Sequence, residues 1–149
     1  MAPDFELPGT EGPFKLSDHR GERVILLFYP GDETMVCTRQ FCSYRDRPEE
    51  LSELDATVVG ISAQSLDSHQ RFTAKHSLNV PLLADVDKRV ARTYGALMPG
   101  LNTTRRATLL IDEQGVVRHR QDHLLGLDFE SLDDLRAALR SLPAPPAQS

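Results

Sequence analysis

The sequence predicts an α/β domain with a mixed central sheet, flanked by helices and preceded by an N-terminal hairpin. Short apolar, β-favouring runs alternate with amphipathic stretches, which is typical of helices packed on a largely parallel sheet. The last two runs are separated only by a tight turn at Glu113 and Gln114, so they form an antiparallel pair. No linker or repeat interrupts the 149 residues. We therefore expect one domain over residues 1–142 and a flexible tail over 143–149.

The strands are expected at the apolar runs and the helices between them. "RVILLFY" (23–29) is continuous, as in a strand buried on both faces. Ser65 is a side-chain cap for one helix, and Pro48 marks the start of another. The predicted strands are 23–29, 56–63, 80–85, 107–112 and 115–120, after a hairpin at 5–18. The predicted helices are one around Cys37, one from Asp46, and those at 65–77, 85–95 and 130–142.

The composition excludes several classes of protein. The formal net charge is −5 and no Lys/Arg-rich run is present, which argues against nucleic acid as a partner. The first residues, "MAPDFELPG", lack the basic and apolar segments of a signal peptide, and no run is long enough to span a membrane. We therefore expect a cytoplasmic protein without a nucleic-acid or membrane partner.

Cys37 and Cys42 are the only cysteines of the chain. Thiols normally stay reduced in the cytosol, so a structural disulfide is not expected. The histidines form no zinc motif with this pair; His119 and His123 are four apart, but they fall where a strand is expected to run into a loop. We expect neither a metal nor a cofactor. On these grounds alone, both cysteines could still be packed core residues.

Cys37 follows the end of a buried strand. Pro30 and Gly31 break that strand, and Thr34 is a reasonable N-cap, so Cys37 falls in the first turn of the next helix. Sites in α/β sheets gather at such positions. The unpaired backbone N–H groups and the helix dipole favour a thiolate there, and the thiolate is the nucleophilic form. Cys37 is therefore the more reactive candidate.

Two acidic residues, Asp32 and Glu33, lie close to Cys37 in the sequence and oppose a negative sulfur. A cation is needed to offset them, and sequence distance does not select one. The start of the strand 107–112 is expected beside the start of the strand 23–29. The candidate cations are Arg39, Arg105 and Arg106.

The spacing of the cysteines constrains how they can react with each other. Residues five apart on a helix have Cα atoms roughly 8 to 9 Å apart and point in different directions. A disulfide needs Cα atoms within about 7 Å. Cys37 and Cys42 can therefore bond only if this helix unwinds, and a short helical piece ending near Pro48 melts at low cost.

Pro30, Thr34 and Cys37 form the pattern Pro-x-x-x-Thr-x-x-Cys, which resembles the active-site loop of the peroxiredoxins. "LLFYP" before it and "CTRQFCSYRD" after it resemble the bacterioferritin comigratory protein subfamily, also called peroxiredoxin Q. There, a second cysteine lies five residues on in the same helix. "RATLLIDEQG" resembles the family segment that carries the active-site arginine, and that register selects Arg106, not Arg105. The resemblance extends over nearly the whole chain.

This resemblance implies a thioredoxin-like fold and a thioredoxin-dependent peroxidase for hydrogen peroxide and organic hydroperoxides. Cys37 would attack the peroxide and become a sulfenic acid, and Cys42 would then form an intramolecular disulfide. Thioredoxin or a similar dithiol would reduce it. Thr34 and Arg106 would hold the peroxide oxygens, and Pro30 would shape the loop and shield the sulfur. A monomer is expected, because resolution needs no second chain.

The chain departs from the subfamily pattern at four positions close to Cys37. Met35 and Val36 stand where Pro-Gly is common, Gln40 where glutamate is frequent, and Phe41 where alanine is frequent. The reacting groups are retained, but the wall of the pocket is expected to be bulkier and more apolar. We therefore expect larger organic hydroperoxides to be accepted.

Other interpretations of the same residues stay open. A thiol–disulfide oxidoreductase usually carries Cys-x-x-Cys, which is absent here. A redox sensor or a holdase would need no peroxidase activity. Thr34 as a mere helix cap and Arg106 as a mere surface ion-pair partner are the corresponding structural alternatives.

Overall fold

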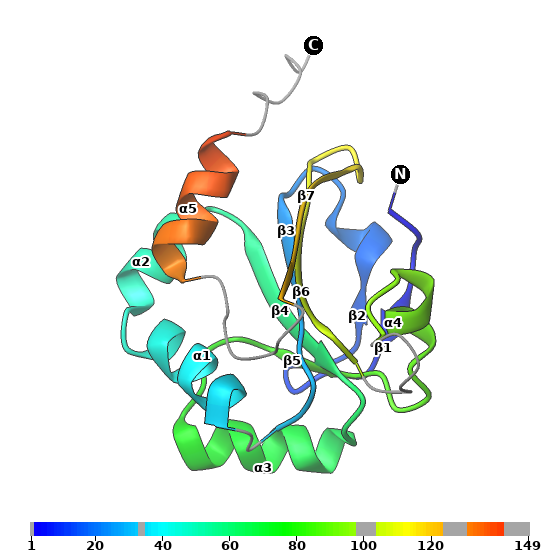
Figure 1. Ribbon diagram of the computed structural model, residues 1–149, viewed down its shortest axis with the longest axis vertical. Coiled ribbons are helices and arrows are strands. Elements are labelled where there is room, and N and C mark those ends of the chain that lie inside the picture. Colours follow the sequence, from blue (N-terminus) through cyan, green and yellow to red (C-terminus); the bar gives the residue numbers. More distant parts are fainter. Residues whose placement is uncertain (1, 33–34, 98–103, 124–130, 142–149) are drawn as a thin grey trace.

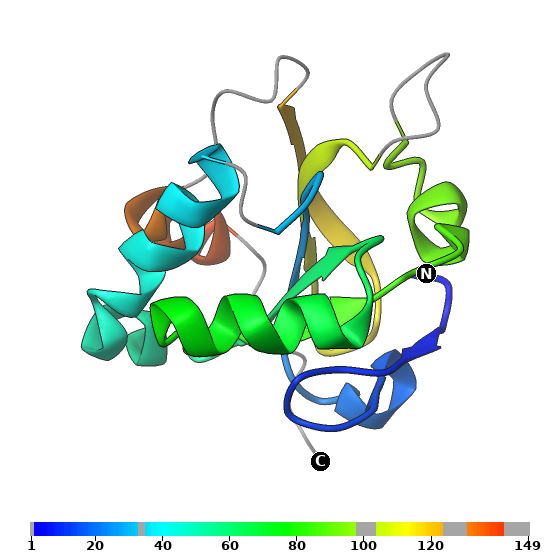
Figure 2. The same cartoon turned by 90° about the horizontal axis from the view of Figure 1, so that it is seen from below.

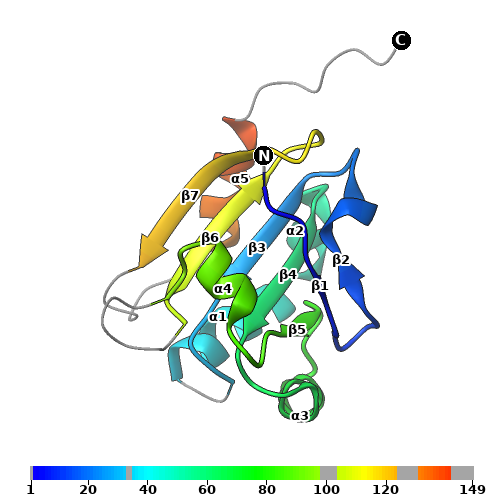
Figure 3. The same ribbon diagram turned by 90° about the vertical axis from the view of Figure 1, so that its right-hand side faces the viewer.

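The computed structural model describes residues 2–32, 35–97, 104–123 and 131–141, with the backbone alone at 35–37 and 123. Its centre is a five-stranded sheet of order β5-β4-β3-β6-β7 (Figures 1 and 3). β3 is parallel to β4, which is parallel to β5, whereas β6 is antiparallel to both β3 and β7. The strands are β3 (Val24–Phe28), β4 (Thr57–Ser62), β5 (Leu82–Ala84), β6 (Arg106–Ile111) and β7 (Val117–His123). The predicted mixed α/β sheet is confirmed.

β3 is apolar throughout because it is covered on both faces. Ile25 and Leu27 face a core formed with four helices, the last of them near the C-terminus. Leu26 and Phe28 face a second core, formed with the N-terminal segment and a short helix. Successive side chains of a strand point to opposite faces, so both sets must be apolar.

The helices cover the sheet unequally, as Figure 2 shows. α1, α2 and α5 lie on one side with α3, and α4 lies on the other side with the N-terminal hairpin β1–β2. The bounds are β1 Glu6–Leu7, β2 Phe14–Lys15, α1 Met35–Arg45, α2 Pro48–Glu53, α3 Leu66–His76, α4 Arg89–Thr93 and α5 Leu132–Arg140, with a 3₁₀ turn at Leu16–His19.

Most helix starts lie where the sequence predicts them. The Ser65 side chain accepts a hydrogen bond from the backbone N–H of Ser68. Ser131 and Asp134 form a reciprocal capping box at the start of α5. Pro48 is the first residue of α2, where its missing N–H costs nothing.

Two predicted bounds are wrong. The helix expected at 85–95 is only α4, because the buried carboxylate of Asp85 accepts hydrogen bonds from the backbone N–H groups of Val90 and Ala91 and so holds the preceding residues in a turn. The strand expected at 115–120 extends to His123, because β6 pairs with it along its full length.

The two edges of the sheet are protected differently. At the β5 edge, the backbone N–H of Ala84 donates to the Pro8 carbonyl at 2.9 Å, and that of Thr10 donates to the Leu82 carbonyl at 3.0 Å. At the other edge, β7 carries the charged and polar sequence "VRHRQDH". Charged side chains on an edge strand discourage pairing with another chain.

Some predictions lie outside the described residues. The expected tail at 143–149 and the last residue of the helix predicted at 130–142 fall there, so the domain bounds stay predictions. In the described part of the chain, no helix combines the length and apolar character required to cross a membrane.

Candidate active site

Cys37 is the third residue of α1, in the first turn after the connection from β3. The prediction of its place in the fold is therefore confirmed. This first turn contains no acidic residue, so nothing within it opposes the attraction between the helix dipole and a thiolate. Thr34 lies outside the described residues, and for Cys37 only the backbone is described. Pro30, half-buried, lies directly between β3 and this connection.

Arg106 is brought to the same end of the sheet by the pairing of β6 with β3. The partners are antiparallel, with Ala107 opposite Phe28, so the start of β6 lies beside the end of β3. The sequence-based expectation that both strands start side by side is wrong, because it assumed a parallel pair. The correction places Arg106 next to the β3–α1 connection.

Arg106 is a buried residue, with 2% of its surface exposed, so it is not a surface ion-pair partner. Its Nη1 donates a hydrogen bond to Oε1 of Gln40 at 2.5 Å. Gln40 is itself buried, and its Nε2 donates to the Tyr44 hydroxyl at 3.1 Å. Gln40 lies one helical turn after Cys37, on the same face of α1. Since an amide is neutral, this partner orients the guanidinium without cancelling its charge.

The other two candidate arginines do not reach this position. Arg105, the neighbour of Arg106 along the chain, donates from Nη2 to the Gly95 carbonyl at 2.7 Å and forms an ion pair with Asp122 at 3.4 Å. Arg39 lies on α1 with its side chain exposed. Of the three cations, the described contacts join only Arg106 to the buried side of α1.

The residue that faces Asp32 is a histidine that the sequence does not single out. His69 of α3 is fully buried, and its Nδ1 lies 2.7 Å from Oδ2 of Asp32. Burial opposes ionisation, but hydrogen bonds from His69, Tyr29 and Ser68 outweigh it and hold the pKa of Asp32 below its ordinary value. The available signal was the spacing of His69 and Phe72, which places a histidine on the buried face of α3.

Cys42 is a free, half-buried thiol near the end of α1, packed against the apolar core. Both cysteines lie in one unbroken helix, so their Cα atoms are too far apart for a disulfide in this conformation. Phe41 is fully buried, with T-shaped ring contacts to Tyr29, Tyr44 and Phe72. It packs so closely on β4 that a Cβ on Gly60 would lie 2.9 Å from its ring.

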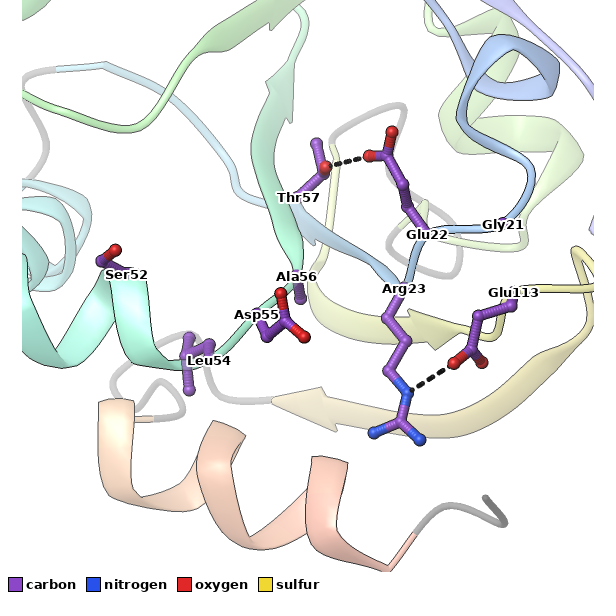
Figure 4. Close-up of a pocket in the computed structure, with 9 residues that line it drawn as sticks. All are labelled: Gly21, Glu22, Arg23, Ser52, Leu54, Asp55, Ala56, Thr57 and Glu113. Atoms are coloured by element: carbon purple, nitrogen blue, oxygen red, sulfur yellow. Dashed lines mark hydrogen bonds and ion pairs between the residues drawn. The ribbon is translucent and has the colours of Figure 1, made fainter. Parts of the chain in front are cut away.

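A cavity of about 670 Å³ lies at the opposite end of the sheet (Figure 4). Its wall includes an ion pair between Arg23 and Glu113, at 3.3 Å, and a hydrogen bond from the Thr57 hydroxyl to Glu22, at 2.6 Å. These residues adjoin the starts of β3 and β4, whereas the predicted site adjoins their other ends. The cavity contains no predicted site residue. Within the described ranges, no cluster of three or more potential metal ligands occurs.

Comparison with known proteins gives a consistent result for sequence and structure. The model of the AhpC/TSA family matches residues 1–120. A putative peroxiredoxin bcp of Coxiella burnetii is 41% identical over 123 residues, covering 78% of this chain and 82% of that protein. Peroxiredoxin Bcp of Bacillus subtilis is 39% identical over 121 residues, covering 76% and 77%.

Solved structures of similar fold cover almost the entire chain. Peroxidoxin BcpB from Mycobacterium tuberculosis superposes with a TM-score of 0.80 at 31% identity, covering 96% of both chains. The bacterioferritin comigratory protein of Xanthomonas campestris superposes with a TM-score of 0.79 at 26% identity, covering 92% of this chain and 90% of that one. The order of the sheet and the position of Cys37 at the start of α1 agree with these matches. The chain belongs to the AhpC/TSA family of peroxiredoxins, in the bacterioferritin comigratory protein and peroxiredoxin Q subfamily.

Proposed function

We propose that the chain reduces hydrogen peroxide and organic hydroperoxides with Cys37, resolves the product with Cys42, and is recycled by thioredoxin or a similar dithiol. As a peroxiredoxin it is a thiol peroxidase; the proposal adds the residues and the order of the steps. The observation that carries it is the buried guanidinium of Arg106, bonded to Gln40 one turn after Cys37 at the end of β3.

In the first step, the thiolate of Cys37 attacks one peroxide oxygen. The S–O bond forms as the O–O bond breaks, and the second oxygen leaves as water or an alcohol after taking up a proton. Negative charge moves onto that oxygen in the transition state, where the preorganised charge of Arg106 stabilises it. Thr34 and the backbone N–H groups at Val36 and Cys37 would supply further donors, and Pro30 would shield the sulfur.

In the second step, the thiolate of Cys42 attacks the sulfenic sulfur of Cys37. The S–S bond forms and the sulfenic oxygen leaves as water. α1 must unwind before this disulfide can form, and the burial of Phe41 and Tyr44 indicates which part of the helix unwinds. Because exposing two buried aromatic rings costs several kcal/mol in total, we expect unwinding of the turns before Phe41. An external dithiol then reduces the disulfide by exchange.

We further propose that the protein works as a monomer. Both reacting cysteines lie in one helix, and the edge strand β7 carries charges that oppose pairing with a second copy. The sedimentation coefficient of the reduced protein should match a single chain, and a stable dimer would contradict this assignment.

Quenched-flow mixing of the reduced protein with hydrogen peroxide tests the proposed function. Both thiols should disappear at a rate far above that of free cysteine, because the site favours the thiolate and stabilises the departing oxygen. The readout is thiol titration of acid-quenched samples. Thiol loss no faster than that of free cysteine would contradict the proposal and favour a disulfide oxidoreductase or a redox sensor.

Replacing Cys42 by serine should leave the first step intact and stop the second. The Cys37 sulfenic acid should then accumulate, since Cys42 no longer competes for it, and dimedone should trap it in mass spectra. The wild-type protein, oxidised by one equivalent of peroxide, should instead yield a peptide pair joined by a Cys37–Cys42 disulfide. A wild-type product that lacks this disulfide would refute the role of Cys42.

A further inference from the structure

A buried ion pair lies at the start of the connection between β3 and α1 and takes no part in the steps above. Nδ1 of His69 is 2.7 Å from Oδ2 of Asp32, and Nε2 of His69 is 3.0 Å from the backbone carbonyl oxygen of Leu83. The exposed fractions of the two side chains are 0% for His69 and 2% for Asp32. Such burial makes the charge state of each partner depend on the other.

The geometry assigns the protons of this pair. A carbonyl oxygen only accepts hydrogen bonds, so Nε2 of His69 carries a hydrogen. The Asp32 carboxylate also accepts from the hydroxyls of Tyr29, at 2.7 Å, and Ser68, at 2.8 Å. With these donors already directed at it, the carboxylate is ionised, and Nδ1 of His69 carries a hydrogen as well. His69 is therefore an imidazolium.

The pair also fixes the connection between β3 and α1. The backbone N–H of Asp32 donates to Oε1 of Gln64 at 3.0 Å, and the Ser62 hydroxyl donates to the same oxygen at 2.7 Å. The Tyr29 hydroxyl bridges to Asp32 from the other end of the connection. Residues 29–32, at the start of that connection, are thus held by side chain and backbone against the start of α3 and the end of β4.

The charge of the pair matters because Asp32 lies five residues before Cys37. An unpaired carboxylate there would oppose a second negative charge on the sulfur, and low local dielectric would strengthen the opposition. Among the described residues, the titratable groups facing His69 are Asp32 and Tyr29, while Ser68 on α3 and the Leu83 carbonyl on β5 complete the contacts of the pair. With His69 charged, the pair is neutral overall.

We propose that His69 is a positioning residue for the peroxidase reaction: its imidazolium cancels the charge of Asp32 at the start of the β3–α1 connection, so that the Asp32 carboxylate does not disfavour the thiolate of Cys37. This inference rests on the proposed role of Cys37 as the attacking thiol. It assigns to α3 a function in the reaction, although α3 contributes no reacting group.

The test follows the thiolate of Cys37 as a function of pH, in a Cys42→Ser background so that one thiol reports. His69→Asn should raise the pKa of the Cys37 thiol by about one unit and lower its peroxide rate at neutral pH about tenfold, because the Asp32 charge is then uncancelled. The double variant Asp32→Asn with His69→Asn should return the pKa and rate to within about threefold of the parent protein, because no charge is left to cancel. Rates of alkylation by iodoacetamide give the pH profile.

Three controls make the result decisive. His76→Asn changes a histidine on the same helix, which contacts Phe72, and should not move the profile. Asp32→Asn alone removes the negative charge, so it should not raise the pKa of the Cys37 thiol, and a raised pKa in this variant would contradict the inference even where His69→Asn does not fold. Equal slowing of the His69 single and double variants, with an unchanged pH profile, would overturn the inference. Peroxide consumption by Cys37→Ser would instead overturn the proposed function, whatever the His69 variants do.

Discussion

Replacing Cys37 by serine is expected to lower the rate of peroxide consumption by at least about 10³-fold. A serine hydroxyl stays protonated at neutral pH, so neither the helix dipole at the start of α1 nor Arg106 can convert it into an anionic nucleophile. The measurement is a single-turnover assay in which remaining hydrogen peroxide is determined after rapid mixing with excess protein.

Cys42→Ser is the matched control, because it makes the same chemical change five residues away in the same helix. It should retain the wild-type rate in a single turnover, since Cys42 acts only after the O–O bond has broken. Comparable losses in both variants would mean that the two thiols act together in the first step. Retention of the rate in Cys37→Ser would exclude Cys37 as the attacking residue.

Replacing Arg106 by glutamine is the second change with a large expected effect. We expect the second-order rate constant with peroxide to fall about 10²- to 10³-fold, the loss typical of removing one preorganised group that stabilises a developing negative charge. The Arg106→Lys variant should lie between glutamine and wild type, because lysine keeps the charge but not the planar fork that reaches Gln40.

Arg105→Gln is the control for this prediction, since Arg105 precedes Arg106 but contacts Gly95 and Asp122 instead of α1. Its rate constant should stay within about threefold of wild type. Arg106 is buried, so thermal unfolding of each variant should accompany the kinetics. A similar loss for Arg105→Gln, or a wild-type rate for a folded Arg106→Gln, would contradict the assignment.

Much of the fold follows from local patterns, because a strand buried on both faces must be apolar along its length. That condition located β3, and capping chemistry located the start of α3 at Ser65. The capping box at Ser131 was not predicted. The local pattern gave the wrong start for α4. There the Asp85 carboxylate accepts hydrogen bonds from N–H groups five and six residues further along the chain, so the helix begins later than predicted. Propensity over a short window does not include such a contact.

The candidate site was predictable in part. The break at Pro30 after a buried strand located Cys37 in the first turn of α1, and the structure confirms that position. The roles assigned to Pro30, Thr34, Cys42 and Arg106 stay proposals that the variants above test. His69 was missed because its partner, Asp32, lies 37 residues away, and nothing local distinguishes a buried histidine that pairs with a distant carboxylate from one that packs.

The sequence by itself determined that Cys37 and Cys42 share one helix, and therefore that a disulfide between them requires unwinding, because helix geometry depends only on local spacing. Which partners the charged residues near Cys37 contact was decided by the tertiary structure. The antiparallel pairing of β6 with β3 carries Arg106 to the β3–α1 connection, and the packing of α3 places His69 on Asp32. Electrostatic interactions act through space, so they depend on which elements the assembled sheet brings together.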